Sequence, residues 1–145
     1  MATWRDVRRI VSGFPDTTES SGRMGTATWH VHGKSFAWER PLRKADLAEL
    51  GDAAPRGPIL VVRTGDLGTK EAILASDRAF FTTSHFDGYA AVLVNLQAIS
   101  ATALRDVLTE SWLVRAPKRT AETFVASRRA KRGKASLRRL ANGDA

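Results

Sequence analysis

The side chains best suited to bind a partner in this sequence are the basic residues near its C-terminus. They are Lys118, Arg119, Arg128, Arg129, Lys131, Arg132, Lys134, Arg138 and Arg139. Guanidinium and ammonium groups contact phosphate without a preformed pocket, and each contact releases counterions condensed on a nucleic acid. The sequence therefore predicts a segment that binds phosphates and loses affinity as the salt concentration rises.

The net charge of the chain is concentrated in that segment. Residues 1–115 hold 14 of the 23 Lys and Arg and 13 of the 15 Asp and Glu, which leaves them at +1, whereas residues 116–145 carry +7. A neutral domain with a charged end is typical of an interaction arm. We expect DNA or another polyanion as the partner. The alternatives are a purely solubilising tail and an acidic protein partner. No membrane is expected, because the tail lacks a bulky apolar face.

Three histidines raise the alternative of a small metal-dependent enzyme. His30 and His32 are two residues apart in a predicted strand, so their side chains leave the same face. Together with His85 and Asp87 they have the residue types of a zinc site. Polar residues on the outer face of a sheet explain the same pattern, and the sequence does not show whether the three rings converge. We expect no metal and no cofactor.

Other catalytic patterns are incomplete. Ser84, His85 and Asp87 are the residue types of a hydrolytic triad, but neighbours on an extended chain point to opposite sides and no G-x-S-x-G turn presents the serine. Residues 65–70 resemble a phosphate loop without matching G-x-x-x-x-G-K-[ST], and Asp66 would repel phosphate. Cysteine is absent, which excludes disulfides and cysteine nucleophiles. The protein is therefore not expected to be an enzyme.

Apolar periodicity predicts the elements that position these residues. Thr3 and Asp6 form a capping box for a first helix, which ends near Gly13. Further helices are predicted over Lys44–Leu50, Gly68–Ala75, after Ser100, and from Pro117 to Gly133. Strands are predicted over Thr26–His32, Ser35–Arg40, Ile59–Val62 and Tyr89–Leu96, with an extended segment at Phe80–Phe81. Residues 16–25 are predicted to be a loop, Gly33–Lys34 a turn, and residues 134–145 disordered.

Aromatic residues are prominent on the first two predicted strands. Trp29 alternates with polar neighbours, and Phe36 and Trp38 are two apart, so these two are expected to share one face. If exposed, such rings would stack on unpaired bases. Alternation favours a position in the core for all three, and Tyr89 is likewise expected to anchor the core.

The order of elements predicts an α+β fold. A mostly antiparallel sheet of four or five strands would carry helices on one face. We place this domain at residues 1–120, and a basic C-terminal helix and tail, partly disordered, at residues 121–145. No apolar run approaches the roughly 18 residues needed to cross a bilayer, and the N-terminus lacks the apolar core of a secretory signal. The expected location is the cytoplasm, and the oligomeric state stays open.

Several ordered segments resemble the MmcQ/YjbR family. They are the helix around Asp6-Val7-Arg8, the stretch Gly33-Lys34-Ser35-Phe36-Ala37-Trp38-Glu39-Arg40-Pro41, Lys70-Glu71-Ala72-Ile73-Leu74, the stretch from Phe80 to Tyr89, Val92-Leu93-Val94, Ser111-Trp112, and Ala116-Pro117-Lys118-Arg119. The resemblance covers about residues 4–120. It implies a curved antiparallel sheet, similar to the CyaY-like and secretion-chaperone-like folds, and a DNA-binding function, as members are commonly described.

These observations predict a non-enzymatic DNA-binding protein that contacts phosphates with little sequence specificity. Lys34, Arg40, Arg43 and Lys44 are predicted to lie near a second contact edge. The alternative is a protein-interaction or chaperone-like module that uses the face or an exposed edge of the sheet.

Overall fold

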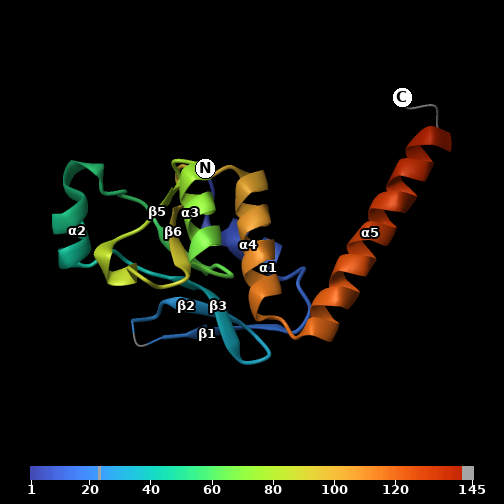
Figure 1. The fold of residues 1–145 in the computed structure, drawn as a ribbon, viewed down its shortest axis with the longest axis horizontal. Helices are drawn as coiled ribbons and strands as arrows, with labels where there is room; N and C mark the ends of the chain where they lie inside the picture. The colour runs from blue at the N-terminus through green and yellow to red at the C-terminus, as the bar shows by residue number, and fades with distance from the viewer. Residues whose placement is uncertain (23, 142–145) are drawn as a thin grey trace. The chain divides into compact units, whose positions relative to one another are not determined.

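The computed structural model describes residues 1–22 and 24–141, with side chains through residue 133 (Figure 1). The chain divides into a compact unit, residues 1–115, and a second unit that begins at Ala116 and consists of helix α5 (Lys118–Ala141). The first unit holds α1 (Trp4–Val11), β1 (Thr17–Ser21), β2 (Ala27–Val31), β3 (Lys34–Glu39), α2 (Lys44–Leu50), β4 (Ile59–Arg63), α3 (Leu67–Ser76), β5 (Phe80–Phe81), β6 (Ala91–Asn95) and α4 (Ala101–Arg115). Two short 3₁₀ helices, η1 (Gly51–Ala53) and η2 (Ser84–Phe86), complete it.

The strands form one antiparallel sheet in the order β1-β2-β3-β4-β6-β5, so the α+β prediction is confirmed. The sheet has six strands and not the four or five expected, because β1 joins its edge. Strand β1 was predicted to be a loop, which is wrong. Its sequence TTESS is mostly exposed, so no apolar alternation marks it as a strand. Backbone pairing with β2, from Thr17 opposite Val31 to Ser21 opposite Ala27, holds it at the sheet edge.

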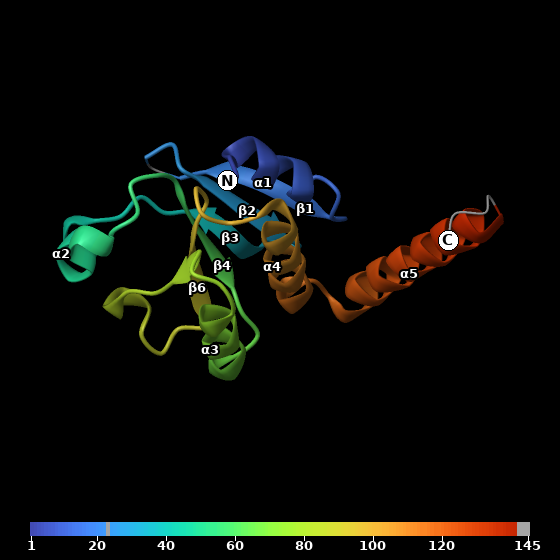
Figure 2. The same cartoon turned by 90° about the horizontal axis from the view of Figure 1, so that it is seen from above.

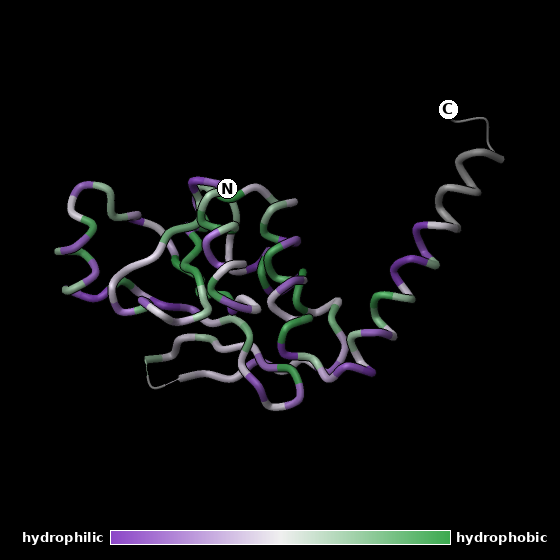
Figure 3. Tube along the Cα trace, viewed as in Figure 1, coloured by the Kyte–Doolittle hydropathy of each residue, from purple (hydrophilic) through white to green (hydrophobic). Residues whose placement is uncertain are grey.

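Helices α1 and α4 cover one face of the sheet, as Figure 2 shows from above. The central row of this face runs through Trp29, Ala37, Val62 and Val92, which lie opposite one another across four strands and are buried. Trp112 of α4 lies with Phe14 and the sheet in this core. The capping box of Thr3 and Asp6 at the start of α1 is confirmed. Hydrophobic colour accordingly follows the central strands in Figure 3.

The opposite face of the sheet carries a second, smaller core. It consists of Ile59, Val61, Phe86, Ala91 and Leu93, with Trp38, Leu42 and Phe81 packed against it. Trp38 thus lies on the face opposite Phe36, contrary to prediction. The cause is a bulge in the β2–β3 pairing, where Trp29 lies opposite Ala37 but His30 lies opposite Ser35. Phe36 is therefore an extra residue, and an extra residue reverses the alternation of side chains along a strand.

Two boundaries differ from the sequence-based expectation. The β2–β3 turn lies at His32 and Gly33, which have φ angles of 49° and 76°, one residue earlier than predicted. Helix α5 does not end at Gly133 but continues to Ala141. A glycine inside a helix costs only about 1 kcal/mol relative to alanine. The Ala, Arg, Lys and Leu residues around it favour helix strongly enough to carry the backbone through. Of the segment predicted to be disordered, residues 134–141 are helical, and residues 142–145 lie outside the described residues.

Candidate nucleic-acid interface

Helix α5 displays most of the predicted phosphate-binding residues in solvent. Five cations have exposed side chains, namely Lys118, Arg119, Arg129, Lys131 and Arg132. Arg128 is half-buried and lies over the ring of Phe124, 5.5 Å from its centroid. Lys134, Arg138 and Arg139 stand on helical backbone, and their side chains lie outside the described residues.

Little negative charge offsets these cations within α5. Glu122 is the one acidic residue of the helix, and its carboxylate is 4.0 Å from the Lys118 ammonium, one turn away. Both side chains are more than half exposed, so this pair contributes at most about 0.5 kcal/mol and is screened by salt. The other described cations of the helix keep their charge available to a polyanion.

The cations of α5 surround the helix axis instead of forming one stripe. Successive residues of an α-helix are 100° apart, so Arg128, Arg129 and Lys131 point in three different directions. Hydrophilic colour recurs along the coloured part of α5 in Figure 3. The helix has 24 residues and is about 36 Å long. A partner on one side of α5 therefore reaches a subset of the cations at a time.

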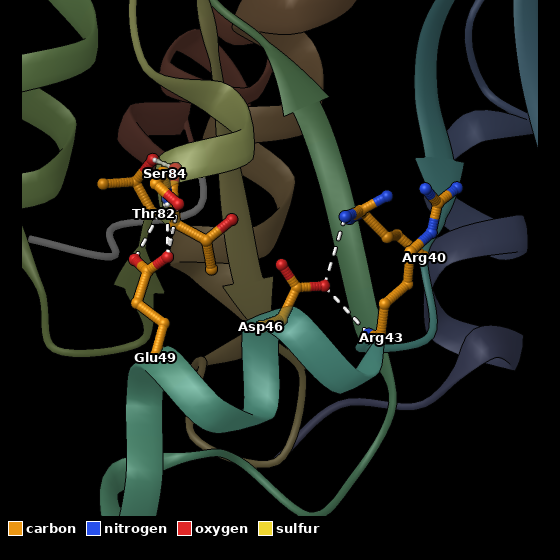
Figure 4. A network of polar contacts seen from close by, with 7 residues as sticks. Arg40, Arg43, Asp46, Glu49, Thr82 and Ser84 are labelled. Carbon is orange, nitrogen blue, oxygen red and sulfur yellow. Dashed lines mark hydrogen bonds and ion pairs between the residues drawn. The ribbon is translucent and has the colours of Figure 1, made fainter.

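Arg40 does not belong to a second contact edge, contrary to prediction. Its side chain is only 8% exposed and donates to the Asp46 carboxylate at 3.1 Å (Figure 4). The guanidinium also lies 4.9 Å from the centroid of the Phe86 ring. Burial acts to raise the pKa of Asp46, but the Arg43 backbone N–H and the Arg40 charge outweigh it, so the pKa is lowered. Lys34, Arg43 and Lys44 are exposed. The sequence did not show that Asp46 would fold back over Arg40.

A second carboxylate attaches α2 to the rest of the domain. Glu49 accepts from the Ser84 hydroxyl at 2.6 Å and from the Ser84 backbone N–H at 3.0 Å (Figure 4). Ser84 is thus engaged by α2 and not by a neighbouring histidine. The contact fastens the start of η2 to the end of α2, so Ser84 has a structural role.

The three histidines do not come together. His30 contacts the Ser20 hydroxyl at 2.9 Å on the sheet. His32 lies in the turn beyond the end of β2 and contacts Asp16 at 3.0 Å, so the two do not share a strand face as predicted. His85 packs edge-on against Phe86. Within the described part of the chain, no group of three His, Asp or Glu residues is arranged to hold a metal ion.

Sequence reasoning missed an arginine on the open part of the sheet. The Arg63 guanidinium lies 5.1 Å from the Trp38 ring centroid and 5.2 Å from that of Tyr89. It donates to the Ser35 carbonyl at 2.9 Å, to the Ser35 hydroxyl and to the Tyr89 hydroxyl. The sequence predicts that Tyr89 anchors the core. In the structure, Tyr89 is 40% exposed, so this prediction is wrong. One signal in the sequence could have indicated it, because Arg63 is the charged residue that directly follows the apolar run 59–62.

Two open grooves lie elsewhere on the first unit. One of about 700 Å³ runs between α2 and the start of β4, and its lining includes Trp4, Leu47 and Arg56. The other, of about 390 Å³, lies between α3 and α4 and includes Phe80, Val107 and Glu110. Neither is lined by a residue that the sequence marked as a binding residue.

Comparison with known proteins decides the family. The YjbR family model matches residues 12–114, most of the chain. The chain belongs to the YjbR family. It is 47% identical over 131 residues to the uncharacterized proteins Rv2570 of Mycobacterium tuberculosis and Mb2600 of Mycobacterium bovis, with 88% of this chain and 98% of each relative covered. The predicted resemblance is thereby confirmed.

A solved structure shows the same fold. The crystal structure of Deinococcus radiodurans protein DR2400, which has a DUF419 domain, aligns with a TM-score of 0.56 and 20% identity. The alignment covers 79% of this chain and 78% of that protein. The YjbR match ends before α5, whereas the mycobacterial alignments are long enough to extend into it. Among the described helices, none is both long and apolar enough to cross a bilayer.

Internal hydrogen bonds explain residues 65–70 of this YjbR domain, which resemble a phosphate loop. Asp66 caps α3 by accepting from the Thr69 backbone N–H at 2.6 Å. The Lys70 ammonium donates to the carbonyls of Phe86 and Tyr89 at 2.7 and 2.8 Å, and burial lowers its pKa. Lys70 therefore holds the segment 84–89 in place.

Proposed function

We propose that this YjbR-family protein is a non-enzymatic binding protein that contacts DNA through its phosphates with little sequence preference. The observation that supports the proposal best is the set of exposed cations on α5, accompanied by a single carboxylate. The first unit is nearly neutral, so attraction to a polyanion originates in α5. Electrostatic attraction of this kind supplies essentially all non-specific DNA binding.

The arrangement of the cations favours phosphate contacts over base contacts. Reading bases requires side chains aligned into one groove with fixed donor geometry. The α5 cations instead point in several directions around the helix, and phosphates lie on every side of a nucleic acid. We expect a dissociation constant of about 10⁻⁴ to 10⁻⁶ M at physiological salt, typical of non-specific binding.

Fluorescence anisotropy with a labelled DNA duplex at several salt concentrations tests the proposal. If all nine basic residues met phosphates, the slope of log K against log salt would approach about −8. Because the cations surround α5, we expect a shallower slope. Removing residues 121–145 should abolish most of the affinity. Unchanged binding after this truncation, or no binding at low salt, contradicts the proposal.

A substitution set separates charge from chain length. The variant with Arg128, Arg129, Lys131 and Arg132 all replaced by Gln keeps good helix formers and removes four charges. Its salt slope should become shallower by up to about 3.6. The matched control replaces Arg5, Arg56, Arg78 and Arg105, which are exposed on the first unit, by Gln. Equal losses in the two variants would mean that net charge alone, and not α5, attracts DNA.

The edge strand β1 supports a second candidate, a protein-interaction module. Strand β1 pairs with β2 on one side only, and its side chains from Thr18 to Ser21 are exposed. An edge of this kind is a template for a strand from a partner protein. A partner that is retained without residues 121–145 but lost on Thr18→Pro would favour this function over DNA binding.

A further inference from the structure

The sheet has an uncovered region on the face opposite α1 and α4. Thr28 and His30 of β2 are half-buried, whereas the alternating residues Ala27, Trp29 and Val31 are fully buried on the helix-covered face. Ser35 and Trp38 of β3 are also half-buried. Outside the small core around Phe86, this face of the sheet is therefore accessible to a ligand.

Arg63 is the one arginine within the described strands, and its guanidinium is held in place before any ligand arrives. It lies between the rings of Trp38 and Tyr89, and three of its N–H groups donate to Ser35 and Tyr89. A guanidinium has five N–H donors in a planar fork. Within the described residues, two donors are left for a partner. A side chain already ordered loses less entropy on binding than a mobile one.

The charge around Arg63 favours an anion. By strand register, the side chains on this face are Thr18, Ser20, Thr28, His30, Ser35, Trp38, Ile59, Val61, Arg63, Phe81, Ala91, Leu93 and Asn95. None of these described strand residues is Asp or Glu. In the neighbouring loop, the charge of Asp87 acts on Lys70.

We propose that this face, formed by Thr28, His30, Ser35, Trp38, Arg63 and Tyr89, binds single-stranded nucleic acid. Arg63 contacts a backbone phosphate, and the ring of Tyr89, which is 40% exposed, offers a surface on which an unpaired base stacks. Base–aromatic stacking is how proteins commonly hold single strands, and it tolerates any sequence. A duplex offers the phosphate but keeps its bases stacked internally. The inference deepens the proposed function by naming the ligand of the first unit.

The test compares two ligands on the full-length protein. Labelled oligo-dT of about twelve nucleotides and a duplex of the same length are titrated by anisotropy at one salt concentration. Tyr89→Leu should weaken oligo-dT binding about fivefold or more and duplex binding less than twofold. Tyr89→Phe keeps the ring and should retain most of the affinity. Leu47→Ala, at an exposed apolar position on α2, is the matched control and should change neither.

The outcomes separate this inference from the proposed function. Unchanged oligo-dT affinity in Tyr89→Leu, or an equal loss for duplex, overturns the sheet-face site. Binding of the mononucleotide dTMP as tightly as oligo-dT overturns the assignment to a strand. Neither outcome affects the role of α5, which depends on the fourfold Gln variant. Arg63→Gln should weaken oligo-dT as well. Because this change also removes three internal hydrogen bonds, the Tyr89 variants decide the question if Arg63→Gln fails to fold.

Discussion

Removing the Asp46 carboxylate should destabilise the first unit strongly. Arg40 and Asp46 are 8% and 4% exposed at their side chains, and their charged groups are 3.1 Å apart. In Asp46→Ala, the Arg40 guanidinium is left buried without its counterion. Asp46 also accepts from the Arg43 backbone N–H at 2.9 Å at the start of α2, so this donor loses its partner as well.

The expected loss is about 3 kcal/mol in the free energy of unfolding. Breaking a buried ion pair by removing one partner costs about 3–5 kcal/mol. The lower end applies because Arg40 keeps its position 4.9 Å above the Phe86 ring, which offsets part of the loss. With a urea m-value of about 2 kcal/mol/M, the midpoint of unfolding should fall by about 1.5 M.

Urea unfolding monitored by tryptophan fluorescence measures this loss, because Trp29 and Trp112 are fully buried. Asp52→Asn, at an exposed carboxylate directly after α2, is the control and should change stability by less than about 0.5 kcal/mol. The double variant Arg40→Met with Asp46→Leu should recover most of the stability, since no buried charge remains. A loss below 1 kcal/mol in Asp46→Ala, or no recovery in the double variant, refutes the reasoning.

Three further predictions concern the same unit. The folded-state pKa of Asp46 lies below its ordinary value of 3.8, so the stabilisation by its carboxylate is present above that pH and is lost on acidification. Below about pH 4, the stability of the wild type should therefore fall more steeply than that of Asp46→Asn. The urea midpoint measured at a series of acidic pH values tests this. Lys70→Met should cost about 2–4 kcal/mol and speed hydrogen exchange in residues 84–90, because two carbonyls lose their donor; exchange that stays slow would argue against this anchoring. Ser111→Ala should cost about 2–4 kcal/mol by urea unfolding, because the buried Ser111 hydroxyl accepts from the Arg63 backbone N–H and donates to the Phe36 carbonyl. An unchanged stability would mean that water replaces the hydroxyl.

Local patterns in the sequence were sufficient for much of the fold. The alternation of Ala27, Trp29 and Val31 placed β2 and its buried face correctly. In α4, the predicted face of Leu104, Val107, Leu108, Ser111 and Trp112 is the buried face in the structure. These predictions held because burial on one side of an element imposes its period directly on the sequence.

Features set by distant pairing were not predictable. Strand β1 has no apolar face, so only its partner β2 makes it a strand. The bulge opposite Trp29 is a property of two strands together, and it moved Trp38 to the other face. The Arg63 cluster draws residues from β3, β4 and the loop before β6, which lie up to 54 positions apart in the chain. The charge of α5, by contrast, was evident from composition alone.

The two proposed contacts depend on different physical forces. Attraction by α5 is electrostatic and is screened over about 8 Å at physiological salt. Stacking on Tyr89 is short-ranged and releases no counterions, so it lacks the salt dependence of phosphate contacts. A duplex, whose bases stay stacked internally, gains no stacking on Tyr89, whereas a single strand does. Raising the salt concentration therefore weakens the shared electrostatic contribution and leaves the stacking contribution, so the preference for single strands over duplex grows as total affinity falls. The nearly neutral first unit fits this difference, because its sheet face adds stacking selectivity with the electrostatic attraction of a single arginine, Arg63.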